Sequence, residues 1–392
     1  MSKGRIKVGI YGVSLLMMGV IFVSGALSTI GSNFPDASQT MIQNLVAIPC
    51  LAVIPTTIIV GLAVDKVSKK TLSIIGVILF LIGGIVPVFL NSLGPILVFR
   101  AILGVGIGIC QVIPTALGAQ YFEGAEREKV QGMVTAMQML GAAVMIFISG
   151  RLAEVSWRYS FIVYAIAIVS LILAFACIPG DKPVAASANE ASDAPKARLT
   201  GKAWIWALVM FIFFIAGMVF SVFASYLIAE KGAGTAAQSG NAVSLQMIGG
   251  FIMGLIYGKF ASVTKKVSLS IGFLGIALAY VLMAAASSVL LIYVGAFIFG
   301  LALSIVMPCI FVEAGNAVPP AVAGLSISMT TCAQNLGQFV CPYIMNPFAG
   351  ALSGSTGAGV NTTAFWIAAV WMAVMFVIAL IWGIAQNRKL SK

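Results

Sequence analysis

The chain contains no histidine, and only 8% of its 392 residues are charged. Histidine is the commonest metal ligand and the usual proton-switching side chain, so its absence removes both roles. Soluble domains are about 25% charged, so the composition excludes an ordinary soluble protein. Neither a histidine-based nucleophile pair nor a clustered metal centre can be assembled. We therefore expect no catalytic residues, no metal site, no cofactor and no enzyme activity.

Acidic residues are scarce, with 11 Asp and Glu against 22 Lys and Arg, which gives a formal net charge of +11. An excess of basic residues can indicate a nucleic acid partner. Here the position of these residues in the loops on one side of a membrane explains the excess, and we expect no nucleic acid partner. The six cysteines all fall in apolar stretches and show no C-x-x-C spacing. They are interpreted as small apolar side chains.

Long apolar stretches dominate the chain, which is 61% hydrophobic. A bilayer core of about 30 Å needs roughly 20 apolar residues per helix, and only helices or closed barrels satisfy their backbone there. The runs are continuous and do not alternate as barrel strands do. We predict an all-α polytopic membrane protein with twelve transmembrane helices: 8–31, 41–63, 71–90, 95–118, 131–152, 160–178, 203–228, 241–262, 269–286, 288–312, 322–350 and 362–385.

The basic residues lie almost entirely in the loops on one side of these helices. With a cytoplasmic N-terminus, only Arg151, Arg158 and Lys231 fall outside, and Arg100 is embedded. The positive-inside rule then predicts that both termini are cytoplasmic. We expect the protein to lie in the inner (cytoplasmic) membrane of the cell. The bilayer is thus an expected partner, and we expect a monomer.

One polar linker divides the chain into two halves. Residues 179–202 are rich in Ala, Ser and Pro, as in a flexible cytoplasmic loop, and separate an N-terminal six-helix bundle (1–178) from a C-terminal one (203–392). The halves echo each other, because Gly106 and Gly300 are each followed eight residues later by Pro114 or Pro308. Duplicated six-helix units are common in secondary transporters, whose substrate sites lie at repeat interfaces.

Glutamines recur at equivalent places along the chain. Gln43, Gln138, Gln246 and Gln334 stand in similar contexts in the second, fifth, eighth and eleventh helices, as expected if each half is itself a pair of three-helix inverted repeats. In the eleventh helix, four polar residues share one face through i, i+3, i+4 and i+7 spacing: Thr331, Gln334, Asn335 and Gln338. Such a stripe either joins helices or lines a cavity, and we interpret it as cavity lining.

Three motifs together resemble the major facilitator superfamily over the whole chain. The strongest is Gly61-x-x-x-Asp65-Lys66-x-x-Lys69-Lys70, which is similar to that family's signature loop, with Ser68 where a Gly is usual. The others are the Arg100 to Gly108 element, with glycines at 104, 106 and 108, and Trp157-Arg158-x-x-Phe161. The resemblance implies two pseudo-symmetric six-helix bundles that alternate access, with the signature loop (Gly61, Asp65, Lys66, Lys69, Lys70) as a conformational gate.

Two ionisable residues in or near the membrane need explanation. Arg100 costs several kcal/mol in a bilayer, so it either binds a substrate carboxylate, pairs with an embedded acid or bonds to backbone carbonyls. Glu313 ends the tenth helix and serves either an interfacial structural role or proton coupling and gating. A coupling proton or a counter-substrate is accordingly a candidate partner.

The predicted function is secondary active transport of a small organic solute by alternating access, with organic anions as the class that Arg100 suggests. Substrate-binding candidates are Arg100, Gln138, Gln246, Thr331, Gln334, Asn335 and Gln338. An alternative is efflux of lipophilic compounds through a cavity rich in Phe and Met, although the fifth helix lacks the Gly-Pro pair usual in drug exporters of the family. A non-transporting membrane sensor or scaffold is the alternative from another class.

Overall fold

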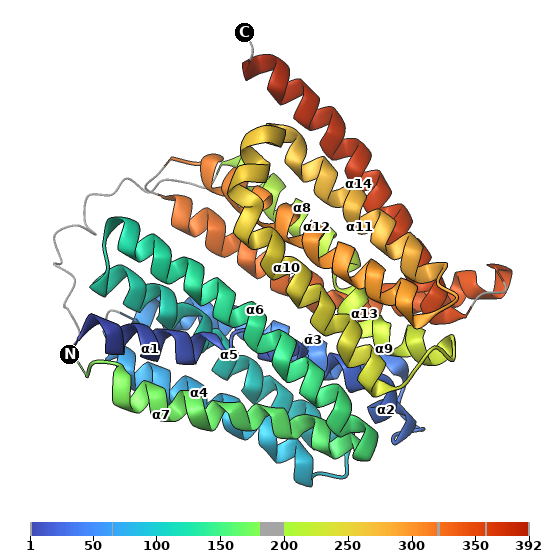
Figure 1. The fold of residues 1–392 in the computed structure, drawn as a ribbon, viewed down its shortest axis with the longest axis horizontal. Helices are drawn as coiled ribbons and strands as arrows, with labels where there is room; N and C mark the ends of the chain where they lie inside the picture. Colours follow the sequence, from blue (N-terminus) through green and yellow to red (C-terminus); the bar gives the residue numbers. More distant parts are fainter. Residues whose placement is uncertain (1, 65, 181–199, 320–321, 357–358, 391–392) are drawn as a thin grey trace. The chain divides into compact units, whose positions relative to one another are not determined.

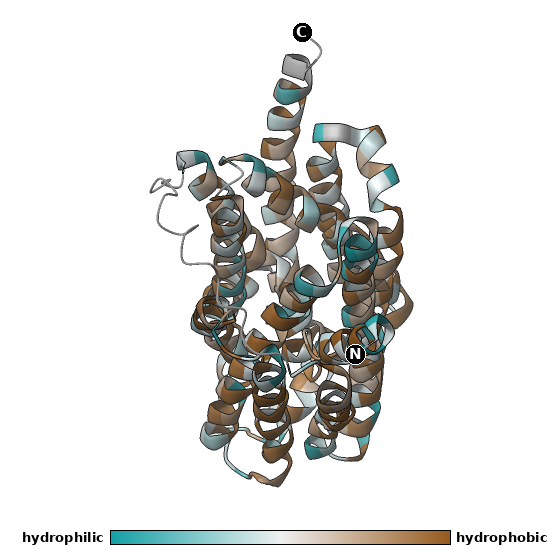
Figure 2. Cartoon of the chain, turned by 90° about the vertical axis from the view of Figure 1, so that its left-hand side faces the viewer, coloured by the Kyte–Doolittle hydropathy of each residue, from teal (hydrophilic) through white to brown (hydrophobic). Residues whose placement is uncertain are grey.

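The computed structural model describes residues 2–64, 66–180, 200–319, 322–356 and 359–390. Over these ranges the chain is helical and has no strand. Ten of its helical segments are long and apolar enough to cross a membrane, and Ser268–Ala284 is a shorter apolar helix. The prediction of an all-α polytopic membrane protein is thereby confirmed. Hydrophilic residues gather toward the ends of the helices, while their middles are mostly hydrophobic (Figure 2).

The first six predicted spans correspond to eleven short or long helical elements. They are α1 (Lys3–Ser14), η1 (Gly19–Ile21), η2 (Ser24–Ala26), α2 (Leu27–Ser32), α3 (Gln39–Ala63), α4 (Lys69–Ile85) with η3 (Val86–Phe89), α5 (Leu93–Tyr121), α6 (Gly124–Val155), and η4 (Trp157–Ala165) with α7 (Ile166–Cys177). The first span is thus not one continuous α-helix, because tight 3₁₀ segments replace its middle. Such breaks leave backbone carbonyls without an α-helical partner.

The last six spans are α8 (Gly201–Gly217) with α9 (Val219–Glu230), α10 (Ala236–Thr264), η5 (Lys265–Val267) with α11 (Ser268–Ala284), α12 (Val289–Asn316), α13 (Ala323–Thr356) and α14 (Val360–Leu390). Helix α8 begins where Thr200 Oγ1 accepts from Ala203 N at 3.4 Å, a standard N-cap. The same hydroxyl donates to Ala317 O at 2.7 Å and so joins the ends of α8 and α12.

The chain forms two compact units. One comprises Met1–Val23 and Thr29–Lys196, and the other comprises Ser24–Ser28 and Ala197–Lys392. In the first unit, α5 packs against both α3 and α4, and in the second α10 and α11 pack against α12 while α13 packs against α8. The helices within each unit lie alongside one another (Figure 1). Most of the predicted linker 179–202 lies outside the described residues, and the predicted bundle boundaries stay a prediction.

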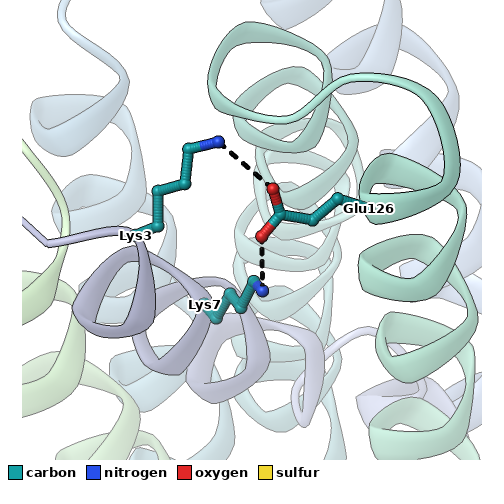
Figure 3. A network of polar contacts seen from close by, with 3 residues as sticks. All are labelled: Lys3, Lys7 and Glu126. Carbon is teal, nitrogen blue, oxygen red and sulfur yellow. Dashed lines mark hydrogen bonds and ion pairs between the residues drawn. The ribbon is translucent and has the colours of Figure 1, made fainter.

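An ionic cluster joins the N-terminal ends of α1 and α6. Lys3 and Lys7, one helical turn apart on α1, flank the Glu126 carboxylate at 3.2 and 2.7 Å (Figure 3). Both ammonium groups also lie within 6 Å of the Phe122 ring centre. Since these side chains are between 32% and 64% exposed, solvent screens the charges, and the cluster adds little stability and mainly orients the two helix ends.

A carboxylate closes the junction between α9 and α14 in the second unit. Glu230 accepts from Asn361 N and Nδ2 at 2.8 and 2.9 Å, and from Thr362 N and Oγ1 at 3.0 and 2.6 Å. Two of these donors are backbone N–H groups at the start of α14, which lack helical partners. A Cβ at Gly359 would lie 2.1 Å from the Glu230 carboxyl carbon, so any larger residue there would displace the Glu230 carboxylate from these donors.

Candidate functional site

Arg100 lies in α5 and is fully buried in the first unit. Each of its three guanidinium nitrogens donates to a protein oxygen: Nε to Leu45 O at 2.5 Å, Nη1 to Tyr164 Oη at 2.6 Å and Nη2 to Val20 O at 2.9 Å. Tyr164 in turn donates its hydroxyl hydrogen to Gly19 O at 2.8 Å. The guanidinium therefore joins α5 to α3, to the first span and to η4.

The carbonyls that Arg100 reaches are ones that the helices themselves cannot fully satisfy. Leu45 lies four residues before Pro49, whose missing N–H leaves the Leu45 carbonyl without its α-helical donor. Gly19 and Val20 lie in η1, where the first span departs from α-helix. In a bilayer such carbonyls must be satisfied by other protein groups. Arg100 and Tyr164 meet that requirement.

The glycines after Arg100 bring its helix close enough for these bonds. A Cβ at Gly104 would lie 2.4 Å from Pro49 O on α3, and one at Gly108 would lie 2.8 Å from Thr56 Cβ on the same helix. On the other side, a Cβ at Gly106 would lie 2.5 Å from Phe80 N on α4. Small residues at such crossings let helix backbones approach closely. The Arg and Gly element thus works as a packing device around a buried charge.

These contacts favour one of the roles that the sequence left open for Arg100. Bonding to backbone carbonyls is observed, and the partners of all three nitrogens belong to the protein. A contact with a substrate carboxylate stays a prediction.

The polar stripe of the eleventh span lies on α13. Thr331, Gln334 and Gln338 are partly exposed, and Asn335 is 7% exposed. Thr331 and Asn335 bond within their own helix, to Ile327 O at 3.0 Å and Thr331 O at 2.9 Å. The helix packs closely on α8 beside the stripe, because a Cβ at Gly337, three residues after Gln334, would lie 2.6 Å from Phe211 O. Although α13 has 34 residues, it is not among the ten apolar spans, and this stripe is one reason.

The other glutamine candidates lie on separate helices of the two units. Gln138 on α6 is half-buried, and Gln43 on α3 is fully buried. Gln246 on α10 is 3% exposed, and its backbone carbonyl would lie 2.0 Å from a Cβ at Gly300 of α12. Its side-chain Oε1 has no hydrogen-bond partner among the described residues.

The aromatic residues of the seventh span are packed into the interior of the second unit. Phe213 meets Phe273 with ring centres 5.6 Å apart, and Phe220 meets Phe299 at 5.3 Å. All four rings are at most 1% exposed. They form packing contacts, and this favours the interpretation as core over an aromatic cavity.

The signature loop is described only in part, because Asp65 lies outside the described residues. Gly61 lies near the end of α3, and a Cβ added there would have no neighbouring atom within 4 Å. Lys66 is exposed, and Lys69 and Lys70 begin α4 half-buried. The Lys70 ammonium lies 4.8 Å from the Phe175 ring centre on α7.

Glu313 forms an ion pair with Lys266 in the second unit. The Glu313 side chain is 17% exposed and the Lys266 side chain 32%. Lys266 also lies 5.9 Å from the Trp382 ring centre on α14, and Tyr257 Oη lies 3.4 Å from Cys309 Sγ, one turn before Glu313. Lys266 stands in the second half where Lys70 stands in the first, so the internal repeat was the signal that could have identified it.

Two further residues escaped the sequence analysis. Tyr164 supports Arg100, but a tyrosine in an apolar span carries no signal of its partner. Glu230 is a span-end acid that accepts four hydrogen bonds, and its partners lie 131 and 132 residues away. The one sequence signal was the Asn361-Thr362 pair at the start of the predicted twelfth helix, since Asn and Thr are common at helix N-caps.

Comparison with known proteins identifies relatives of this chain. The model of the Major Facilitator Superfamily matches two overlapping stretches, residues 9–342 and 206–392. A curated relative, the uncharacterized MFS-type transporter EfpA of Mycobacterium tuberculosis, is 31% identical over 100 residues. That stretch is 25% of this chain and 19% of the relative, so the chain matches about a fifth of the relative's length.

Solved structures share the fold at low sequence identity. The POT family transporter PepTSo has a TM-score of 0.77 at 10% identity, covering 100% of this chain and 99% of its own. The nucleoside transporter NupG gives 0.75 at 14% identity, with 96% and 99% covered. A D-xylose-proton symporter gives 0.74 at 17% identity, with 95% and 97% covered. These likenesses concern the fold and leave the substrate open.

Proposed function

Since the chain belongs to the Major Facilitator Superfamily and is a multi-pass membrane transporter rather than an enzyme, we propose that it carries a small organic solute by alternating access. The moving parts in this proposal are the bundles 1–178 and 203–392, joined by the linker 179–202. Both termini face the cytoplasm, as the basic loops require. A proton or a counter-substrate supplies the driving force, and one chain suffices.

The observation that carries this proposal is the stripe of uncharged polar residues on α13. Thr331, Gln334 and Gln338 are partly exposed on a helix that packs on α8 at Gly337. Polar side chains avoid lipid, so a partly exposed stripe within a membrane protein suits a wet path for a solute. Gln138 and Gln246 extend the same chemistry to other helices.

The organic-anion version of the proposal rests on Arg100. Its support is the cost of an intramembrane guanidinium, which a carboxylate would offset. The bonds of Arg100 to Leu45 O, Val20 O and Tyr164 meet much of that cost already. Uncharged solutes therefore stand beside anions as candidates.

The gate in this proposal includes the signature loop and the Lys266–Glu313 pair. Asp65 with Lys66, Lys69 and Lys70 would hold one end of the first bundle, and Lys266–Glu313 would hold the corresponding end of the second. Asp65→Asn should slow transport and leave ligand affinity within the range that a shifted conformational equilibrium allows.

The test is a ligand screen followed by transport in proteoliposomes. Organic anions, sugars, nucleosides and apolar compounds are added to the purified chain, because a bound ligand at 100 Kd stabilises the fold by about 2.7 kcal/mol. Compounds that raise the melting temperature are then tested for counterflow, with protein-free liposomes as the control. If no class raised the melting temperature or supported counterflow, the proposal would fail.

A further inference from the structure

Five buried polar atoms in the second unit have no hydrogen-bond partner among the described residues. One is Thr363 Oγ1 on α14, and the other four are Ser24 Oγ, Tyr226 Oη, Asn241 Oδ1 and Gln246 Oε1. Ser24 and Gln246 are only 1% and 3% exposed. Burying a polar atom without a partner is costly, and most such atoms in native proteins are paired, so this group needs an explanation.

The four residues come from three elements that contact one another, η2, α9 and α10. At one contact a Cβ on Gly25 would lie 2.8 Å from Gly240 Cα, and Ser24 and Asn241 adjoin this contact along the chain. Just after η2, Ser28 of α2 joins α9, because Ser225 Oγ accepts from Ser28 N at 2.7 Å and donates to Ser28 Oγ at 2.7 Å.

Tyr226 follows Ser225 directly on α9. Gln246 lies five residues beyond Asn241 on α10. Four of the five unpaired atoms thus belong to residues of three elements that contact one another, η2, α9 and α10.

The chemistry of these atoms selects the groups that can satisfy them. The amide oxygens of Asn241 and Gln246 can only accept, while the hydroxyls of Ser24 and Tyr226 can accept or donate. Asn241 already uses its amide nitrogen, which donates to Tyr293 Oη at 3.3 Å. A carboxylate has no hydrogen to offer the two amide oxygens. Among the buried side chains of the described ranges, Arg100 is the only charged one, and it belongs to the first unit.

We infer that the junction of η2, α9 and α10 binds a neutral solute that carries hydroxyl or N–H donors. This rests on the proposed transport function and narrows its substrate class. Tyr226 and Gln246 are the specificity-determining residues, since one donor of the solute bonds to the amide oxygen of Gln246 and another group bonds to the phenol of Tyr226. Discontinuous helices such as the first span, which contributes Ser24, commonly shape such sites in transporters.

The first test measures binding by the full purified chain. The probes are glucose, xylitol and uridine as neutral donors, and succinate and benzoate as anions. We expect a neutral probe to raise the melting temperature and the anions to leave it unchanged. Tyr226→Phe and Gln246→Met should each weaken binding of that probe about tenfold, which corresponds to about 1.4 kcal/mol. Tyr159→Phe, which removes an exposed hydroxyl in the first unit, is the matched control and should bind normally.

The second test uses the same variants without any probe. If the phenol and the amide oxygen are unpaired in the empty protein, replacing them with apolar groups of similar shape removes a cost, so the melting temperature should stay equal or rise. A lower melting temperature in both variants would mean that these atoms hold structural water or protein partners, and it would overturn the inference.

Two other results would also overturn it. One is a neutral probe that binds the parent, Tyr226→Phe and Gln246→Met equally. The other is a panel in which no neutral probe binds. If anions or apolar compounds are still transported in that case, the proposed transport function stands and only this substrate class is wrong.

Discussion

Replacing Tyr164 with Phe removes a single oxygen from the centre of the first unit. The ring should stay in place, because it packs against Phe22 and Phe80 with ring centres 5.5 Å away in both cases. The hydroxyl makes two bonds, one accepted from Arg100 Nη1 and one donated to Gly19 O. The variant therefore isolates the contribution of the hydroxyl from that of the ring.

The expected loss of unfolding free energy for Tyr164→Phe is about 1–3 kcal/mol. Interhelical hydrogen bonds in membrane proteins contribute about 0.6 kcal/mol on average and at most about 1.7. Bonds to charged groups contribute about 1.5–3 kcal/mol in protein interiors. Two bonds, one of them to a guanidinium, place the sum in that range. The unfolding free energy is measured in detergent by titrating denaturant and monitoring helical content with circular dichroism.

Arg100→Lys separates the scaffold role from a role in substrate binding. A lysine ammonium is a point charge and cannot reproduce the planar set of bonds to Leu45 O, Val20 O and Tyr164 Oη. If Arg100 is a scaffold residue, Arg100→Lys should lower the unfolding free energy more than Tyr164→Phe does. The double variant should lose less than the sum of the two single losses, because the two residues share a hydrogen bond. Unchanged stability of Arg100→Lys, together with a weakened ligand response to anions, would refute this reasoning and restore the anion site. Tyr159→Phe again serves as the control.

Three other outcomes follow from the structure. Glu230→Gln should lower stability by about 1 kcal/mol in a denaturant titration, because an amide can accept at only one of its two ends and Glu230 is largely exposed; stability equal to the parent would contradict the cap. Glu313→Gln and Lys266→Gln should each cost about 1 kcal/mol, and the double variant should recover part of that loss, since each single leaves a half-buried charge unpaired; strictly additive losses would count against the pair. In a background without native cysteines, a membrane-impermeant thiol reagent added outside should label Ser287→Cys and miss Val67→Cys, and the reverse pattern would overturn the orientation.

The architecture could be predicted from the sequence because a bilayer imposes one strong rule on it. Continuous apolar runs must be helices of a given length, so each predicted span has a helical counterpart in the structure. Helix ends were less predictable: α6 begins at Gly124, seven residues before the predicted start at 131, because charged residues continue a helix beyond the apolar core. The broken first span was missed, since its sequence is uniformly apolar and 3₁₀ geometry leaves no compositional trace.

Partners that lie far apart in the sequence could not be predicted in the same way. The sequence showed that Arg100 needs a partner, but choosing Leu45 O over a substrate carboxylate requires knowing that α5 crosses α3 at Pro49. Hydropathy identifies which residues enter the membrane and says nothing of which helix each one faces. Glu230 and its donors on α14 illustrate the same limit, because the two helix ends meet only after folding.

The polar residues of the helical spans and of their ends fall into two sets, those whose polar groups have partners and those whose polar groups do not. Arg100, Glu230 and Glu313 all carry charge, and all have protein partners, so their costs are met within the fold. The atoms left unpaired belong to uncharged side chains such as Gln246 and Tyr226. An uncharged group can remain unpaired in an empty carrier at a cost of about 1–3 kcal/mol, whereas an unpaired charge would cost several times more. A transporter that must pass through a state without its solute can therefore keep neutral groups free for binding, and this asymmetry is the physical reason for expecting a neutral solute at the junction of η2, α9 and α10.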